Sequence, residues 1–144
     1  MLRFSAASIY YIFFILFYLF FKKRSKIKTE NPLLDKSLLF AARIIKLNKY
    51  LIKEKHENII SKQIIRSATS IGANANEAIY GISKADFIAK LQISLKETAE
   101  TEYWLRLLVL SEYITEIESA SLLRDCIEIK KILISTLNTA KENK

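Results

Sequence analysis

Residues 70–87, SIGANANEAIYGISKADF, decide the fold, because they could form either a loop or the middle of a helix. Gly72, Asn74 and Asn76 lie among small residues, as in a glycine- and asparagine-rich binding loop. Apolar residues nevertheless continue through the stretch at spacings of three and four: Ile60, Ile64, Ala68, Ile71, Ala75 and Ala78. A polar strip keeps the same spacing: Gln63, Arg66, Ser70, Asn74 and Glu77. Because a loop has no reason to keep helical spacing, the pattern predicts a helix that runs through Gly72.

Another helix is predicted before this central one. Asn31 and Pro32 begin it, because an asparagine side chain can cap a helix and proline fits the first helical position, where no N–H is needed. Apolar residues then share one broad arc as far as about residue 55: Leu34, Leu38, Phe40, Ala41, Ile44, Ile45, Leu47, Leu51 and Ile52.

Two more helices are predicted after the central one, and both begin at capping motifs. We expect Gly81 to end the central helix in the left-handed conformation that often follows a helix. Ser83 and Asp86 then resemble a cap for the next helix. Thr115 and Glu118 form a capping box for the last helix, which continues to about residue 141.

Composition supports an all-helical fold. The chain has 144 residues, which fits one domain, and it contains only two glycines and one proline. Since strand-rich folds need many turns, we predict an all-α, up-and-down four-helix bundle over residues 31–144. The lone Cys126 cannot form an internal disulfide, which fits a reducing compartment, and it excludes a zinc site with several cysteines.

Residues 1–30 form a separate apolar and basic segment. Residues 4–21 are 18 residues without a charge, and KKRSKIK follows them. As a separate helix they would span about 27 Å, just short of a bilayer's hydrocarbon core. The flanking lysines predict a single anchor with the bundle in the cytoplasm. Five members of this apolar run are our candidate membrane residues: Phe4, Ile9, Phe13, Phe17 and Phe21.

Two alternatives to the anchor stay open. The segment could come from a start codon placed too far upstream, although Met1 is the only methionine in the chain. It could also be a cleaved signal peptide, although the apolar run is long and no site of the A-x-A type follows it.

The net charge of +8 is unevenly spread. Residues 1–30 hold six Lys or Arg against one Glu, whereas residues 31–144 hold 17 against 14 Asp or Glu. Within the bundle, the polar arc of the first helix and one nearby residue form a candidate phosphate-binding face: Lys36, Arg43, Lys46, Lys49, Lys53 and Lys62. The alternative is an ordinary solvated surface.

A second polar group involves the third predicted helix. Ser94, Thr98 and Glu102 lie within its apolar stripe, where a carboxylate is costly unless it is paired. We predict that Arg66 neutralises either Glu102 or Glu77. The polar strip of the central helix, together with Glu102, forms either a polar binding site or a hydrogen-bonded network that fixes helix register or a subunit contact.

Residues 66–108 resemble the four-helix-bundle family named after the 23S rRNA intervening-sequence protein, and a weaker likeness extends over about residues 33–141. The features that carry the resemblance are Arg66, Ser67, Ser70, Ile71, Asn74, Glu77, Ser83, Lys84, Phe87 and Glu102. That family is similar in turn to the accessory variability proteins of diversity-generating retroelements. The resemblance implies a homo-oligomer, expected to be a pentamer, with a nucleic-acid-binding role. The apolar segment before residue 31 departs from the family pattern.

Catalysis has little support in the sequence. His56 is the only histidine and lies in a charged turn, and no catalytic motif, metal site, cofactor site or small-molecule site is expected. We therefore expect a non-enzymatic oligomer that associates with RNA. The alternative is a structural or protein-interaction oligomer that residues 4–21 tether to a membrane.

Overall fold

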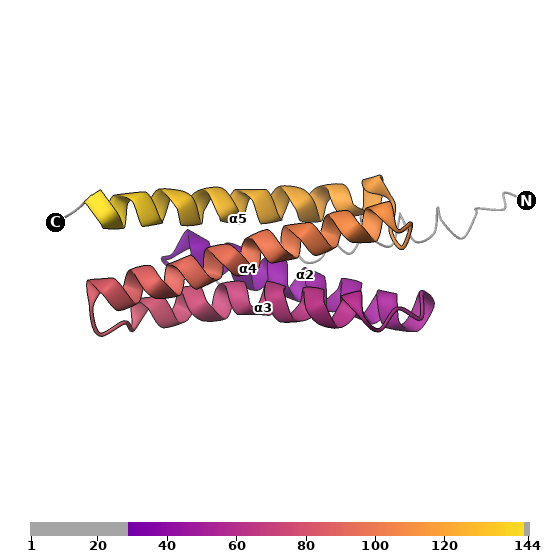
Figure 1. Cartoon of the computed structure of the whole chain (residues 1–144), viewed down its shortest axis with the longest axis horizontal. Coiled ribbons are helices and arrows are strands. Elements are labelled where there is room, and N and C mark those ends of the chain that lie inside the picture. Colours follow the sequence, from indigo (N-terminus) through magenta and orange to yellow (C-terminus); the bar gives the residue numbers. More distant parts are fainter. Residues whose placement is uncertain (1–28, 143–144) are drawn as a thin grey trace, which may run out of the picture. The chain divides into compact units, whose positions relative to one another are not determined.

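The computed structural model describes residues 29–142, and the described residues form four helices without a strand (Figure 1). The helices are α2 (Pro32–Glu54), α3 (Ile60–Ile79), α4 (Lys84–Leu110) and α5 (Glu116–Glu142). All four lie in the unit Asn31–Lys144. The prediction of an all-α four-helix bundle is confirmed. The predicted apolar helix at residues 4–21 lies outside the described residues.

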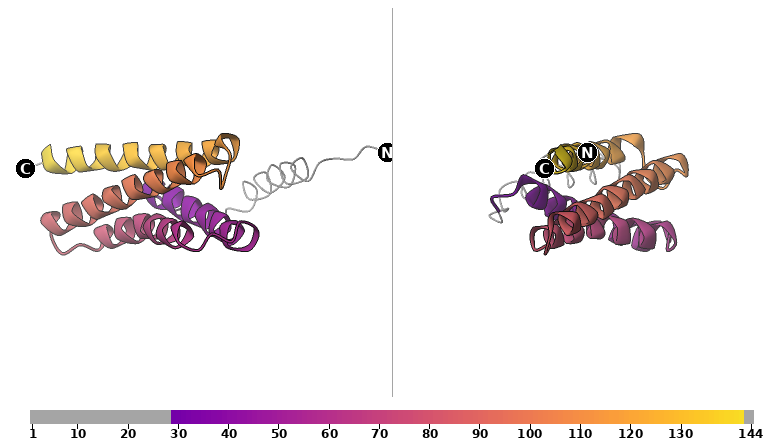
Figure 2. Two further views of the ribbon diagram at one scale, coloured as in Figure 1. Left: turned by 45° about the vertical axis from the view of Figure 1, so that its right-hand side comes forward. Right: turned by 60° about the vertical axis from the view of Figure 1, so that its left-hand side comes forward.

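The helices form an up-and-down bundle (Figures 1 and 2). Each helix packs against the next one in the sequence, and α2 also packs against α5, which closes the bundle. Across the diagonals, no backbone contact joins α2 to α4 or α3 to α5 within the described part of the chain. The outer surfaces of α2 and α4 therefore face opposite sides of the bundle.

Local sequence sets where three of the helices begin. The Asn31 side chain accepts hydrogen bonds from the N–H groups of Leu33 (3.0 Å) and Leu34 (3.4 Å), as its predicted capping role requires. At α5, Thr115 and Glu118 form the predicted capping box: Thr115 N–H donates to the Glu118 carboxylate (2.7 Å), and Glu118 N–H donates to Thr115 Oγ1 (3.2 Å).

The cap of α4 differs slightly from a capping box. Ser83 Oγ accepts a hydrogen bond from Asp86 N–H (3.1 Å), as predicted. The Asp86 carboxylate, however, accepts from Ile82 N–H (3.2 Å) instead of from Ser83. The first turn of α4 is thus tied to the turn that precedes it.

The central helix continues through Gly72, as predicted, and Gly72 lies where α3 comes close to α2. A Cβ atom at Gly72 would lie 3.0 Å from Ser37 Oγ and 3.4 Å from Ser37 Cβ. Glycine in a helix interior costs about 1 kcal/mol relative to alanine, and the close approach of α2 explains why glycine is used here. The stretch 70–79 is therefore part of a packed helix and not a binding loop.

The predicted left-handed conformation of Gly81 is wrong, because no described glycine has a positive φ. The N–H groups of Tyr80 and Gly81 instead donate to the carbonyls of Glu77 and Ala78, which tightens the end of α3. The lack of room for a side chain explains why glycine is used at this position, because a Cβ atom at residue 81 would lie 3.1 Å from both Ala78 O and Phe87 N. Left-handed residues do occur elsewhere, at His56 (φ 53°) and Glu112 (φ 60°), in the two other turns between helices.

The core follows a heptad-like spacing. In α4 the buried residues alternate at three and four: Leu91, Ser94, Thr98, Thr101, Leu105 and Leu108. The other helices contribute similar stripes, including Phe40 and Ile44 from α2 and Ile129 and Leu133 from α5. This spacing is typical of helices that pack in the manner of coiled coils. Each fully buried Leu, Ile or Phe side chain stabilises the bundle by about 1.5–3 kcal/mol.

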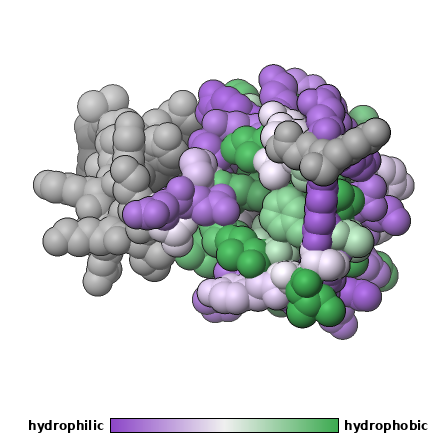
Figure 3. Space-filling view, turned by 90° about the vertical axis from the view of Figure 1, so that its left-hand side faces the viewer, coloured by the Kyte–Doolittle hydropathy of each residue, from purple (hydrophilic) through white to green (hydrophobic). Residues whose placement is uncertain are grey.

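The end of the bundle that carries the α3–α4 turn exposes apolar side chains (Figure 3). Tyr80 is 79% exposed and Ile82 is 96% exposed. In this view hydrophobic surface lies among hydrophilic residues instead of forming one continuous sheet. The opposite end also exposes apolar residues, among them Ile59 and Leu110, so neither end is distinguished by hydrophobicity alone.

Candidate nucleic-acid interface

Three of the predicted phosphate-binding residues share the outer surface of α2. Lys46, Lys49 and Lys53 are separated by three and four residues, and all three are exposed. Partial burial, and then the charge of Lys49, lower the pKa of Lys46 below its usual value. The effect of Lys49 indicates that the two ammonium groups are close enough to repel each other.

Lys62 joins this surface from α3. The side-chain amide of Asn48 donates to the Ser61 carbonyl (2.7 Å), and both residues are buried between the two helices. Lys62 is the next residue and is exposed, so it lies at the same level of the bundle as Lys49. We call Lys46, Lys49, Lys53 and Lys62 the lysine surface.

The structure does not bring the other two predicted residues into this surface. Lys36 Nζ lies 2.8 Å from Glu128 Oε1, and the Arg43 guanidinium binds the Asp125 carboxylate. Arg43 also donates to Ser121 Oγ. Both cations therefore connect α2 to α5. Asp125 and Glu128 are three residues apart, so they lie on one face of α5. The sequence does not show that Lys36 and Arg43 lie opposite this face, because that depends on how α2 packs against α5.

The polar strip of α3 lies along its border with α4. Lys90 from α4 binds the Glu77 carboxylate, and the Asn74 amide donates to the Ser70 carbonyl (2.8 Å). Deeper between the helices, Thr101 Oγ1 donates to Ser67 Oγ (2.9 Å). Within the strip, Glu77 thus contacts α4 and Asn74 bonds within α3, and the two alternatives given by the sequence both stay predictions.

The predicted pairing of Arg66 with Glu102 or Glu77 is wrong. Glu102 binds Arg106, one turn along α4, and Lys130 from α5, while Glu77 binds Lys90. Arg66 lies instead where its charge acts on Glu97. Burial, and then Glu100, raise the pKa of Glu97, and Arg66 partly opposes them.

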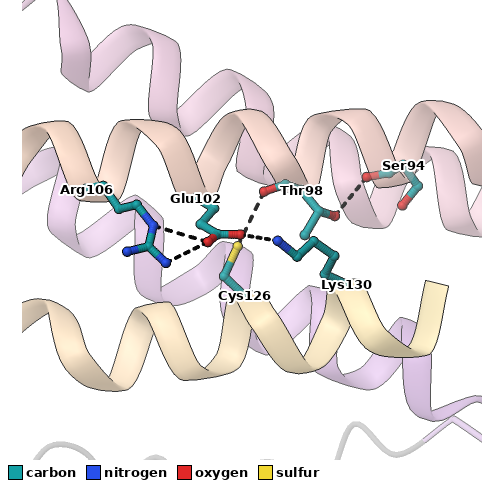
Figure 4. Close-up of polar contacts among 6 residues, drawn as sticks. All are labelled: Ser94, Thr98, Glu102, Arg106, Cys126 and Lys130. Carbon is teal, nitrogen blue, oxygen red and sulfur yellow. Dashed lines mark hydrogen bonds and ion pairs between the residues drawn. The ribbon is translucent and has the colours of Figure 1, made fainter. Parts of the chain in front are cut away.

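Glu102 lies at the centre of a polar cluster between α4 and α5 (Figure 4). Its side chain is only 14% exposed and accepts from Arg106 Nη2 (2.8 Å) and from Lys130 Nζ. These hydrogen bonds, first from Lys130 and then from Arg106, lower the pKa of Glu102. The carboxylate in the apolar stripe is therefore paired on two sides, and its pairs join the two helices.

Cys126 lies beside this cluster and is fully buried (Figure 4). Its thiol donates to the Thr98 carbonyl (3.4 Å). Burial, and then the charge of Glu102, raise the pKa of the thiol to about 12. Since the thiolate is the reactive form, Cys126 is a packing residue and not a nucleophile.

The structure places the histidine and the acidic side chains that were considered as catalytic or metal-binding groups. His56 is exposed in the α2–α3 turn. Between residues 29 and 142, no group of three or more His, Cys, Asp or Glu side chains is placed to hold a metal ion. The lysine surface can present its ammonium groups to an anion.

One residue with a clear local role was missed by the sequence prediction, which gave the segment around His56 only as a charged turn. Glu57 is 6% exposed, and its carboxylate accepts hydrogen bonds from the N–H groups of Ile59 (2.8 Å), Ile60 (2.7 Å) and Ser61 (2.6 Å). It caps α3. The sequence did contain a signal for this role, since a carboxylate within three residues of a helix start is favourably placed to stabilise it.

Among residues 29–142, no helix is long and apolar enough to cross a membrane. The candidate anchor and its residues Phe4, Ile9, Phe13, Phe17 and Phe21 lie outside the described residues. The anchor, and the tethered protein-interaction oligomer that depends on it, therefore remain predictions.

Comparison with known proteins agrees with this architecture. The family described as 23S rRNA-intervening sequence protein matches residues 29–135. A solved structure of a protein of unknown function, from the S23 ribosomal protein family of Bacteroides thetaiotaomicron VPI-5482, is 55% identical with a TM-score of 0.72. The match covers 73% of this chain and 97% of that chain. No curated protein matches the chain. The chain belongs to the family of 23S rRNA-intervening sequence proteins.

Proposed function

We propose that the chain is a non-enzymatic accessory protein that binds RNA through the phosphate groups of the nucleic acid. The observation that carries this proposal is the lysine surface, in which α2 exposes three lysines and the adjoining start of α3 exposes a fourth. The two helices hold them at fixed positions, because Asn48 ties α2 to the start of α3. Anion binding therefore needs no rearrangement of the backbone.

Electrostatics favour a polyanion as the ligand of this surface. Burial and the neighbouring Lys49 lower the pKa of Lys46, so the charged form of this lysine is less stable than in a lysine that stands alone in water. A phosphate chain would relieve that repulsion and favour the charged form. A polymer also offers several phosphates at once, which matches several lysines on one surface better than a single small anion does.

The family name supports RNA over other polyanions. It describes proteins of an intervening sequence of 23S rRNA, and the match covers most of the bundle. The homo-oligomer expected from the resemblance, a pentamer, would repeat the lysine surface in each copy. Repetition increases binding through effective concentration without any new contact.

The test is RNA binding by a protein of residues 29–144 over a range of salt concentrations. This part should fold alone, because the matched region is 97% of the solved relative's chain. The variant Lys46→Gln/Lys49→Gln/Lys53→Gln is expected to reduce the slope of log K against log salt by about 2, since each single-strand phosphate contact contributes about 0.7.

A matched control removes the same charge elsewhere. Lys84, Lys96 and Lys141 are exposed and lie outside the lysine surface. Changing these three to Gln should leave the slope nearly unchanged. The proposal fails if the two triple variants reduce RNA binding equally, or if the unmodified protein does not bind RNA at low salt.

A further inference from the structure

Tyr50 places an aromatic ring at the edge of the lysine surface. It follows Lys46 by four residues and precedes Lys53 by three, so its side chain neighbours both of them on the surface of α2. Tyr50 is half-buried, and it packs against the hydrophobic core. Because that packing holds the side chain in place, the ring lies at a defined position beside the ammonium groups.

One face of the Tyr50 ring is covered by a side chain that can move away. The Lys55 ammonium lies over the ring, with Nζ 5.8 Å from the ring centroid, which is within the range of a cation–π contact. Lys55 is exposed, and a lysine carries its charge on a flexible stem. It can therefore leave the ring without any change in the packing of the helices, and the ring face then becomes accessible to a flat ligand.

The turn after α2 keeps Lys55 close to the ring and to the lysine surface. Helix α2 ends at Glu54, and Lys55 is its C-cap. The next residue, His56, is left-handed, and Glu57 N–H then donates to the Leu51 carbonyl (3.0 Å). The backbone at Lys55 is thus held between the last turn of α2 and the cap of α3. An ammonium group that leaves the ring stays near the phosphates that the lysine surface would bind.

Two other tyrosines are more exposed but lack these surroundings. Tyr80 is 79% exposed, but it lies at the α3–α4 turn, at the opposite end of the bundle from the α2–α3 turn (Figure 1). Tyr103 is 59% exposed and packs edge-on against Trp104, with ring centroids 5.0 Å apart. Trp104 Nε1 donates to Glu100 Oε1 (3.0 Å), and a carboxylate at that place repels phosphate. Tyr50 is better placed than either to meet the base of a bound nucleotide.

We propose that Tyr50 is a stacking site for an unpaired base, and that the ligand of the lysine surface is single-stranded RNA. A base replaces Lys55 over the ring, and Lys55 turns to a phosphate. Bases in a duplex are stacked on one another, whereas unpaired bases can be splayed out onto aromatic side chains. The inference rests on the proposed function and adds to it the class of RNA that is bound.

The charges around Tyr50 give the bound strand a direction. Lys46, Tyr50 and Glu54 are each four residues apart, so they form one row along α2 with the ring between a positive and a negative charge. Phosphates are attracted to the side of Lys46 and Lys53 and repelled from the side of Glu54. The strand therefore runs from the ring toward the lysine surface and not toward the end of α2.

The test compares the binding of oligouridine, which forms no duplex by itself, with the binding of duplex RNA of the same length, for the protein of residues 29–144. Tyr50→Leu keeps an apolar side chain against the core but removes the aromatic face, while Tyr50→Phe keeps both. We expect Tyr50→Leu to lower the affinity for oligouridine about tenfold without changing the salt slope, since a stacked base is lost but no phosphate contact is. Its affinity for duplex RNA should stay within about twofold of the original. Tyr50→Phe should bind both RNAs as the unmodified protein does.

A matched control, Tyr103→Leu, makes the same change on α4 and should leave both affinities unchanged. The stacking site is overturned if the Tyr50→Leu and Tyr50→Phe variants bind oligouridine equally, or if Tyr50→Leu weakens the binding of both RNAs to the same extent. In either case the proposed function stands if Lys46→Gln/Lys49→Gln/Lys53→Gln still reduces the salt slope. If the unmodified protein binds neither RNA, the proposed function is overturned, and this inference with it.

Discussion

At the residue scale, the side chain of Glu57 alone caps the start of α3. Burial acts to raise the pKa of Glu57, but hydrogen bonds from Ile60, Ser61 and Ile59 outweigh it, so the pKa lies below its usual value. The sequence prediction found the caps at Asn31, Thr115 and Ser83 because their motifs are short-range. It missed Glu57 because a glutamate rarely serves as the capping residue.

Glu57 gives a prediction with a defined pH dependence. Glu57→Gln should reduce the free energy of unfolding by about 1–2 kcal/mol at pH 7, since charged caps and charge-assisted hydrogen bonds contribute about that much. The folded pKa is lower than the unfolded one, so the contribution is complete above the unfolded pKa, about 4.3. It should be lost as the pH falls through the folded pKa.

Urea unfolding of the two proteins at a series of pH values measures this difference. We expect the two unfolding free energies to converge in acid. A loss that is equal at every pH would show that the Glu57 charge does not stabilise α3.

At the element scale, the position of Gly72 shows what periodicity can and cannot predict. The spacing of three and four placed the stretch 70–79 in a helix, and the structure agrees. It could not identify Ser37 as the partner of Gly72, since that depends on how α2 and α3 pack. The same limit explains the wrong conformation for Gly81 and the wrong partner for Arg66, because both depend on contacts between helices.

Gly72→Ala tests the close approach. Alanine alone would gain about 1 kcal/mol of helix propensity, but its Cβ would lie 3.0 Å from Ser37 Oγ, a buried hydroxyl that donates to the Leu34 carbonyl. We expect a net loss of about 1 kcal/mol in the free energy of unfolding. In a Ser37→Ala background the same substitution should become neutral or stabilising.

A double-mutant cycle by thermal or urea unfolding measures the coupling between the two positions. A coupling energy near zero would mean that the close approach of α2 does not require glycine at position 72. Another property of α3 would then have to explain this residue.

At the scale of the whole molecule, the sequence predicted the fold well and the candidate site in part. Helix number, order and approximate bounds follow from local patterns, and the four-helix bundle follows from them. The basic face was predicted as one surface of six residues because Lys36 and Arg43 lie on the polar side of α2. The structure divides it, since Asp125 and Glu128 of α5 pair with those two residues, and only the packing of α2 against α5 could reveal this.

That division gives the most direct test of the central claim, that exposed lysines and not the ion-paired cations of α2 bind RNA. The measurement is the salt dependence of RNA binding for two variants: Lys46→Gln/Lys49→Gln and Lys36→Gln/Arg43→Gln. Both remove two positive charges from the same helix. We expect the first variant to reduce the slope of log K against log salt by about 1.4, and the second to leave the slope unchanged and lower stability instead. Equal reductions in slope, or a larger one for the Lys36 and Arg43 variant, would contradict it.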